Sequence, residues 1–349
     1  MIDYSLLKEL CALSGISGDE DRVRRRILDE IRPYADTVRV DPLGNILVHK
    51  KGKSPAKSRL LISAHMDEVG LMVTDITSDG YLKFDEVGGI DRRVLPGKRV
   101  LVGDAALDGV IGIKPIHLTE GDEESAIPKM TELYIDIGAS NSEEAEKLVR
   151  VGDSVCFRSD FYENNKTIRS KAIDDRFGCL VLIGLIKSEL EYDADFSFVV
   201  QEEVGLRGAR VASYTTDPEF ALVVETTTAA DVPEVEESRR VCRLGEGAVI
   251  SVMDRHTIYD RELVRYALDC ASQTGAKAQY KRAVAGGNDA GAIHQSRGGV
   301  RTLAVSLPCR YLHAPNCVAD KDDCESVMKL VAALAEAIAG GVFTANGDH

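Results

Sequence analysis

A change of character between residues 69 and 160 constrains the fold of this 349-residue chain more than any other feature. On both sides of it, segments with helical periodicity alternate with apolar strand-like runs, which is typical of a sheet covered by helices on both faces. Within it, short strands follow one another between turn residues, and only 142–148 is expected to be helical. The pattern predicts an α/β domain built from both ends of the chain, with a small β domain inserted between them.

The expected elements can be placed by their apolar periodicity. Helices are predicted over 3–13, 19–31, 175–190, 206–213, 261–272, 290–295 and 323–339. Strands of the α/β part are predicted over 37–40, 45–50, 59–65, 196–201, 220–226, 247–253, 278–284 and 300–308. Strands of the inserted part are predicted over 69–77, 81–87, 98–103, 108–114, 132–138 and 153–157.

Charge and composition exclude several classes of protein. The formal net charge of −14 argues against a nucleic-acid or anionic-membrane surface, either of which needs a basic field. No stretch approaches the roughly 20 apolar residues that span a bilayer. The chain begins without the pattern of a secretory signal, and its eight cysteines form no CxxC pair, which disfavours a zinc ribbon or a disulfide framework. We therefore expect a reduced, cytoplasmic protein.

A histidine and an aspartate follow the predicted strand 59–65. His65 ends the strand and Asp67 stands two residues later, so this carboxylate can accept the second ring N–H of a metal-binding imidazole. The strand ends of open α/β sheets are where ligands collect. Taken alone, such a pair is a weak signal and is more often structural or incidental.

Two pairs of adjacent acids precede predicted helices. Asp174 and Asp175 can cap a helix and complement its dipole, or Asp174 can bridge two metal ions while Asp175 supports the site. Glu202 and Glu203 directly follow an apolar strand, where close like charges raise one pKa unless cations neutralise them. Dipole complementation is the alternative here too. The functional interpretation makes Glu203 a metal ligand and Glu202 the base that takes a proton from the attacking water.

Two more metal-competent residues follow predicted strands. Glu225 ends the FALVV run, and His313 stands in a proline-flanked loop after 300–308, where a lone histidine is often surface decoration. Because five strands or strand–helix junctions each deliver a histidine or an acid, coincidence is a poor explanation. Two histidines and three carboxylates suit zinc, cobalt or manganese, and a pair of ions would clamp a water and a carbonyl group.

The segments that carry these residues resemble the glutamyl and deblocking aminopeptidases related to the tetrahedral (TET) aminopeptidases, some of which are labelled cellulase M or endoglucanase. The matching segments are, in order, AHMDEVGLMV, KAIDDRFG, QEEVGLRGA, the acid after FALVV, and PCRYLHAP. The inserted segments DEVGGID, DGVIGIKPIH and IDIGASNSEEAEKLVRVGD resemble that family's dimerisation domain. The resemblance implies a mixed-sheet α/β/α metallopeptidase domain of residues 1–66 and 165–349, and an inserted, β-barrel-like dimerisation domain of residues 67–164.

The resemblance also implies a function and roles for single residues. It implies a metalloaminopeptidase that removes N-terminal residues from peptides with two divalent ions, zinc or cobalt, with manganese as the alternative. The implied metal ligands are His65, Asp174, Glu203, Glu225 and His313. Glu202 is the implied general base. Asp67, whose spacing from His65 lets it orient that ring, is the second expected catalytic residue. Asp174 would bridge both ions, often with a cis peptide bond to the next residue.

Two positions depart from the family pattern. The family often carries aspartate where this chain has Glu225, and the longer side chain affects how the carboxylate coordinates and which metal it prefers. The family usually carries threonine where this chain has Asn288, in the segment 286–291 on the substrate side. The first departure bears on the metal and the second on substrate specificity.

Family resemblance further implies assembly, as a dimer through the inserted domain and up to a twelve-subunit shell. His117 in that domain either reaches an active site across an interface or is structural. Three rival functions stay open: a metal-independent, endoglucanase-type glycoside hydrolase, a deacylase of N-acyl substrates, and a shell protein without catalysis. The chain has no tryptophan and 5% aromatic residues, which disfavours a sugar-binding cleft.

Overall fold

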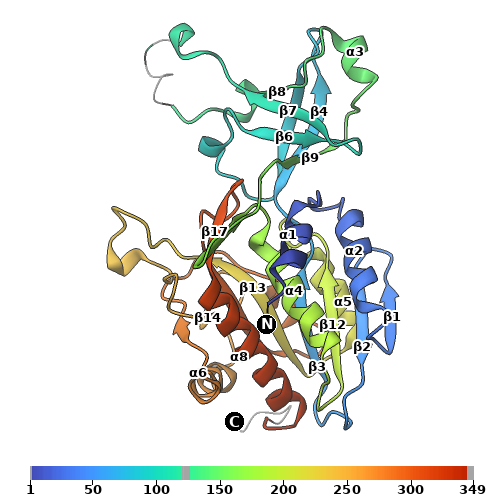
Figure 1. Ribbon diagram of the computed structural model, residues 1–349, viewed down its shortest axis with the longest axis vertical. Coiled ribbons are helices and arrows are strands. Elements are labelled where there is room, and N and C mark those ends of the chain that lie inside the picture. The colour runs from blue at the N-terminus through green and yellow to red at the C-terminus, as the bar shows by residue number, and fades with distance from the viewer. Residues whose placement is uncertain (1, 120, 122–125, 344–349) are drawn as a thin grey trace.

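The computed structural model describes residues 2–119, 121 and 126–343, and it divides into a large sheet with helices and a small closed barrel (Figure 1). The two parts have separate apolar cores. This arrangement confirms the predicted class, a mixed α/β sheet interrupted by a β insertion.

The large sheet holds eleven strands, and its central strands run parallel. Its main path has the order β1-β2-β12-β3-β13-β16-β17-β11-β10, while β14 pairs with β15 and β16. The bounds are β1 Thr37–Val40, β2 Ile46–Lys50, β3 Leu60–His65, β10 Tyr162–Glu163, β11 Thr167–Ser170, β12 Ala194–Val199, β13 Phe220–Thr228, β14 Ala248–Ile250, β15 Ala278–Tyr280, β16 Arg301–Arg310 and β17 Cys317–Asp320. Strands β3 and β13 are buried almost throughout, as expected for strands covered on both faces.

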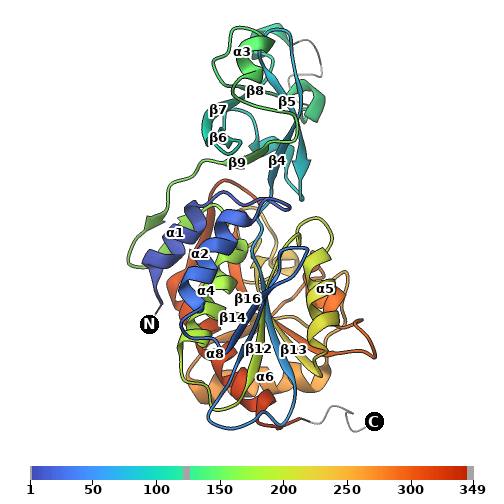
Figure 2. The same cartoon turned by 90° about the vertical axis from the view of Figure 1, so that its right-hand side faces the viewer.

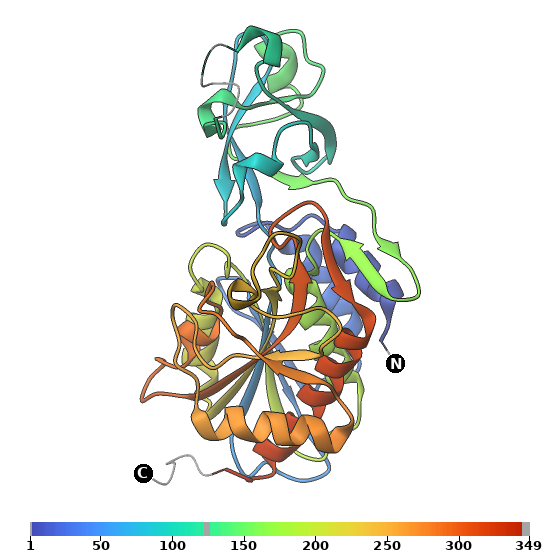
Figure 3. The same cartoon turned by 90° about the vertical axis from the view of Figure 1, so that its left-hand side faces the viewer.

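Helices cover both faces of this sheet (Figure 2). Their bounds are α1 Tyr4–Ala12, α2 Asp21–Ile31, α4 Ile173–Lys187, α5 Arg207–Thr216, α6 Arg261–Thr274, α7 Ala290–Ile293 and α8 Lys321–Ala339. Helix α4 packs on β3 and β13 and is covered by α1 and α2, while α5 lies on the opposite face (Figure 2). Figure 3 shows α6, in orange, against the end of the red helix α8.

The barrel closes in the order β4-β5-β8-β7-β6-β9. Its bounds are β4 Gly70–Ile76, β5 Leu82–Val87, β6 Arg99–Val102, β7 Leu107–Gly112, β8 Tyr134–Asp136 and β9 Ser154–Phe157, with helix α3 Ser142–Glu146 beside it. Alternate strand residues such as Leu71, Val73 and Ile111 fill its interior. The proposed domain boundaries at 67 and 164 stay a prediction.

Sequence periodicity misplaces a few strands. Strands β10, β11 and β17 were not predicted, because they are short and lie beside loops rich in polar residues. The strand predicted over 278–284 ends at Tyr280, and the chain beyond it enters the wall of a cavity. Within the described part of the chain, no helix combines the length and apolarity needed to cross a membrane.

Candidate metal centre

The site lies where the parallel strands of the large sheet end. His65 is the last residue of β3 and pairs in register with Val199, the last residue of β12. The chain after β12 turns through Gln201, whose φ of +56° is left-handed, and presents Glu202 and Glu203. Glu225 lies within neighbouring β13. Parallel strands thus bring residues that are distant in sequence to one edge of the sheet.

Asp174 stands at the centre of the cluster. Its Oδ1 lies 3.2 Å from His65 Nε2, and its Oδ2 lies 3.3 Å from His313 Nε2. Each histidine also faces a glutamate: His65 Nε2 is 3.1 Å from Glu225 Oε1, and His313 Nε2 is 3.3 Å from Glu203 Oε1. Asp174 is therefore shared between two groups of three potential ligands, each with ligand atoms within 4.8 Å of one another.

The peptide bond between Asp174 and Asp175 is cis, as the family resemblance implies. Asp175 is fully buried, and its two oxygens accept the N–H of His65 at 3.3 Å and that of Gly178 at 3.0 Å. The second bond caps the first turn of α4, and the first joins this turn to the end of β3. The same carboxylate thus makes a bond within its own helix and a bond to the backbone of His65, while its part in a metal site stays a prediction.

Asp67 does not face the open site. It is fully buried, and its oxygens accept the N–H of Glu202 at 3.0 Å, the N–H of Glu203 at 3.1 Å and the hydroxyl of Ser17 at 2.6 Å. His65 Nδ1 lies 3.5 Å from Asp67 Oδ1 and 3.0 Å from the Asp67 carbonyl oxygen. The Asp67 carboxylate thus contacts His65 at the end of β3 and the backbone of Glu202 and Glu203 after the neighbouring strand β12.

A loop after β16 brings the last histidine to the site. His313 has a left-handed φ of +56°, as does Tyr311 at +59°. Its Nδ1 lies 2.8 Å from the carbonyl oxygen of Gly89, in the segment that follows β5 of the barrel. Side chains in sparsely populated backbone regions gather at functional sites when the surroundings hold them there, and both barrel and sheet hold His313.

A buried ion-pair network lies beside the site, at the end of β3 and the start of α4. Lys171 Nζ lies 2.6 Å from a carboxylate oxygen of Glu68, and both side chains are about 3% exposed. Arg176, fully buried, donates to the carbonyl oxygens of Met66 at 2.7 Å and Leu10 at 2.6 Å. These cations tie the segment after β3 to α4 and to the end of α1. Buried charges of this kind are tolerated because each is paired and hydrogen-bonded.

The pKa shifts of the cluster show that its buried carboxylates are stabilised by bound protons or other positive charge. Burial and the charge of His313 act in opposite directions on Glu203, and its pKa rises to about 8. Burial, reinforced by neighbouring carboxylates, raises the pKa of Glu202 and Glu225 above the usual range. Burial would lower the pKa of His313, but Asp174 and Glu203 outweigh it and raise it to about 10. Protons held by the cluster in this way would be replaced by cations.

The donor set fits divalent metal ions. Glu225 Oε2 is buried and has no hydrogen-bond partner among the described residues, so its lone pairs are available to a ligand. Imidazole nitrogens and carboxylate oxygens together suit zinc, cobalt or manganese. The cluster opens into a cavity of about 440 Å³, which we call the inner cavity. His65, Asp174, Glu202, Glu203, Glu225 and His313 all line it.

Sequence reasoning missed two residues of this region. Asp289 is fully buried, and neither of its carboxylate oxygens has a partner in the described part of the chain. Lys281 lines the inner cavity, and burial lowers the pKa of its ammonium group. Asn288, noted from the sequence, donates to Tyr259 Oη at 2.9 Å and also lines the cavity. The glycine-rich segment 286–291 was the sequence signal for this side of the inner cavity, because Lys281 follows an ordinary strand and stands out in no motif.

The comparisons with known proteins agree on one family. Residues 44–330 match the family model described as M42 glutamyl aminopeptidase. The lysyl aminopeptidase of Pyrococcus furiosus is 33% identical over 353 residues, which cover 99% of this chain and 100% of that protein.

Comparison with solved structures identifies aminopeptidases of the same fold. A TET aminopeptidase from a marine sediment archaeon of the Thaumarchaeota has a TM-score of 0.91 and 35% identity, with 95% of each chain covered. The TET1 peptidase of Pyrococcus horikoshii, described as assembling into a tetrahedron or a large octahedral shell, has a TM-score of 0.83 and 39% identity. That match covers 95% of this chain and 98% of the other.

Proposed function

The chain belongs to the M42 glutamyl aminopeptidase family, and on that premise we propose that its inner cavity holds two divalent metal ions, zinc or cobalt, with manganese as the alternative. Like its family, it is a peptide hydrolase that cleaves N-terminal residues. The number and identity of the ions and the role of each residue belong to the proposal.

The position of Asp174 carries this proposal. Its two oxygens face different histidines, which is the arrangement expected of a carboxylate that bridges two ions. His65 and Glu225 would complete one ion's ligands, and Glu203 and His313 would complete the other's. When bound, such ions acidify a water molecule and polarise a carbonyl group.

Glu202 is the proposed general base. It lies in one group with His65 and Glu203, with ligand atoms within 4.8 Å of one another, yet its side chain has no hydrogen-bond partner in the described residues. Burial raises its pKa well above the usual range, and the cations would lower it again towards the working pH. Glu202 would accept a proton from the attacking water and pass it to the leaving nitrogen.

Asp67 is proposed as a positioning residue, because it contacts His65 and the backbone of Glu202 and Glu203 but not the inner cavity. By holding the backbone N–H groups of the acid pair, it would fix both the base and a ligand. A carboxylate behind a metal-binding histidine typically affects metal affinity and activity about 10–100-fold.

The N-terminal side chain of the substrate would also enter the inner cavity. Relatives carry names that specify lysyl and glutamyl substrates, so the preference varies within the family. Here the Lys281 ammonium lines the cavity, and no described residue forms an ion pair or a hydrogen bond with it. This supports an acidic N-terminal residue over a basic one.

We also propose a homo-oligomer, built from dimers through the barrel domain of residues 67–164 and extending to a twelve-subunit shell. Assembly of the related TET1 peptidase into closed shells supports this proposal. So does the barrel's exposed apolar surface, where Ile116 and Val151 are 67% and 63% exposed. His117 lies exposed beside Ile116. A reduced, cytoplasmic location is supported by eight buried cysteines with free thiols.

A chelation and substrate experiment tests the proposed function. The enzyme is stripped with a chelator and titrated with zinc, cobalt or manganese against a panel of aminoacyl-nitroanilides and their N-acetyl counterparts. We expect two equivalents to bind, activity to return with them, and acetylated substrates to resist cleavage. Full activity after chelation would overturn the metal proposal, and preferential cleavage of acetylated substrates would favour the deacylase. Family membership already sets aside the glycosidase.

A further inference from the structure

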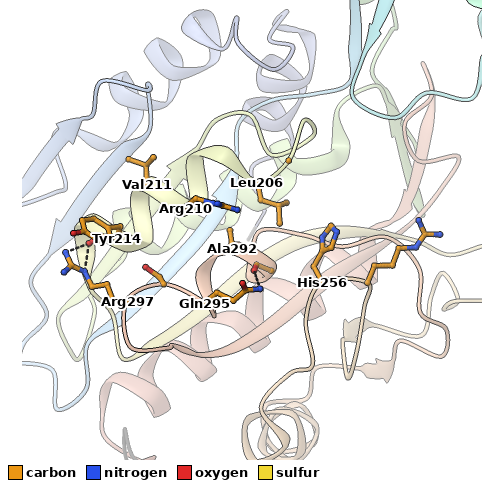
Figure 4. Close-up of a pocket in the computed structure, with 12 residues that line it drawn as sticks. Leu206, Arg210, Val211, Tyr214, His256, Ala292, Gln295 and Arg297 are labelled. Atoms are coloured by element: carbon orange, nitrogen blue, oxygen red, sulfur yellow. Dashed lines mark hydrogen bonds between the residues drawn. The ribbon is translucent and has the colours of Figure 1, made fainter.

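A second, larger cavity of about 880 Å³ adjoins the inner cavity (Figure 4). We call it the outer cavity, and both are lined by Gly205, Leu206, Arg255 and His256. The turn that carries Glu202 and Glu203 continues through Gly205 and Leu206 into α5, which lines the outer cavity. One continuous segment therefore connects the metal centre to this second space.

His256 forms the wall between the two cavities. A Cβ atom at Gly287 of the inner cavity would lie 2.2 Å from His256 Nδ1, and one at Gly291 of the outer cavity would lie 2.6 Å from His256 Cβ. Figure 4 places His256 at one end of the outer cavity, Tyr214 and Arg297 at the other, and Arg210 between them. The two glycines thus make room for the His256 side chain at the junction.

The outer cavity is basic, in contrast to the inner one. Its lining holds Arg210, Arg255, His256 and Arg297, and no aspartate or glutamate among the described residues. Arg297 is engaged with Asp217 at 3.4 Å and with the Tyr214 carbonyl oxygen at 2.6 Å. The guanidinium groups of Arg210 and Arg255 have no ion-pair or hydrogen-bond partner in the described part of the chain. In a protein of net charge −14, a cavity lining that holds three arginines and no described acid is a local exception.

We propose that the outer cavity binds the part of a peptide that follows the scissile bond, and that Arg210 and Arg255 select a carboxylate there. This inference rests on the proposed function, because it requires the substrate's N-terminal residue to occupy the inner cavity. The next residues then pass His256 and enter the outer cavity. The carboxylate is either an acidic side chain of the leaving peptide or its free C-terminus.

The chemistry favours this ligand over others. Guanidinium groups bind carboxylates through paired, charge-assisted hydrogen bonds, which are about twice as strong as neutral ones. A volume of about 880 Å³ lies in the range of sites that enclose ligands of several hundred daltons, so short peptides fit. A basic residue in the same position would face two unpaired cations and be rejected.

Four peptides and one anilide separate the sources of the carboxylate. In each substrate, X is the preferred N-terminal residue, and kcat/KM is measured. X-Ala-Asp-amide is compared with X-Ala-Asn-amide to test an acidic side chain, and X-Ala-Ala with a free C-terminus is compared with its amide to test the terminal carboxylate. X-nitroanilide leaves the outer cavity empty. The same set is run on Arg210→Gln, Arg255→Gln and the double variant. Arg265→Gln, on α6 and outside both cavity linings, is the charge-matched control.

We expect the double variant to lose about tenfold or more in kcat/KM on at least one carboxylate peptide, mainly through KM, as for the loss of a charge-assisted hydrogen bond. The pair of peptides that responds identifies the source. Cleavage of X-nitroanilide by Arg210→Gln, whose residue lines the outer cavity but not the inner one, should stay within about twofold of the control variant. Cleavage of all four peptides at equal rates, or an equal loss on the anilide, would overturn the inference. If the wild-type enzyme does not cleave even X-nitroanilide, the proposed function itself is rejected.

Discussion

The ring Nδ1 of His313 lies 2.8 Å from the carbonyl oxygen of Gly89, so the segment that follows β5 of the barrel orients a proposed metal ligand. A carbonyl oxygen can only accept a hydrogen bond, so Nδ1 carries the proton and Nε2 is the nitrogen that can bind a metal. Nε2 faces Asp174 and Glu203. The barrel therefore contributes to the site itself, in addition to any part in assembly.

Two adjacent glycines test this contact. Gly88 has a φ of +83°, and a Cβ atom there would lie 2.8 Å from Val69 and 3.2 Å from Glu203. At Gly89 the nearest atom, His313 Nδ1, would be 3.8 Å away. We expect Gly88→Ala to lower stability by about 1 kcal/mol or more and to weaken metal binding, in thermal melts and metal titrations. Gly89→Ala keeps the carbonyl and should resemble the wild type; a larger loss in Gly89→Ala than in Gly88→Ala would contradict this account.

Asp67→Asn tests the positioning role. Asparagine has one oxygen, so an amide N–H would face the backbone N–H of Glu202 or Glu203 where a second acceptor is needed. We expect metal affinity or kcat/KM to fall about 10–100-fold. Ser17→Ala, which removes only the hydroxyl bonded to the same carboxylate, is the matched control and should lose less. Equal losses in both variants would show that general packing, and not the hold on the acid pair, explains the effect.

Glu202→Gln separates the base from the ligands. Glutamine cannot accept the proton from water, so we expect kcat to fall by about 10²–10⁴ while both metal ions are retained. Glu203→Gln is the comparison, because it removes a proposed ligand and should lower metal content as well as activity. Metal analysis and anilide kinetics of the two purified variants measure both properties. Near-normal kcat in Glu202→Gln would mean that another group acts as the base.

Asp323 gives stability a pH dependence outside the metal centre. Burial raises its pKa to about 6, although the N–H groups of Gly245 and Gly247, each at 2.7 Å, oppose this. Its ordinary pKa is about 3.9, so the folded state binds more protons than the unfolded state between about pH 4 and 6. Stability from this group is full below pH 4 and is lost as the pH rises through about 6.

Thermal melts across that pH range test Asp323→Asn against the wild type. The stability difference in favour of the wild type should shrink as the pH rises, by up to about 1.4 kcal/mol per unit of pKa difference. Asp322→Asn, at the exposed neighbouring position, controls for a general charge effect. A difference that is constant with pH would refute the assignment.

Much of the site could be predicted because parallel strands impose a simple geometry. His65, Glu202 and Glu225 each follow or end an apolar run, and neighbouring parallel strands in register must deliver them to one edge. The two sheet types were separable because the strands of the insertion alternate between buried and exposed residues, whereas β3 is buried throughout.

Other features depend on contacts that no local pattern encodes. Arg176 reads as an ordinary helix cation, yet it is fully buried because carbonyl groups of three separate segments surround it. Arg210 is exposed on α5, as its sequence suggests, but only the packing of α7 and the segment after it makes that face of α5 a wall of the outer cavity. The contact between His313 and Gly89 joins residues 224 positions apart. Such long-range relationships follow from tertiary packing and cannot be read from periodicity.

The scattering of the metal centre along the chain has a consequence for biosynthesis. His65 leaves the ribosome early, while His313 emerges only when most of the polypeptide has been made, and the barrel carbonyl that orients it is made in between. Domains generally fold during synthesis from the N-terminus onward. With the proposed ligand set, an incomplete nascent chain lacks His313, so we expect the subunit to gain activity only when its synthesis is nearly finished.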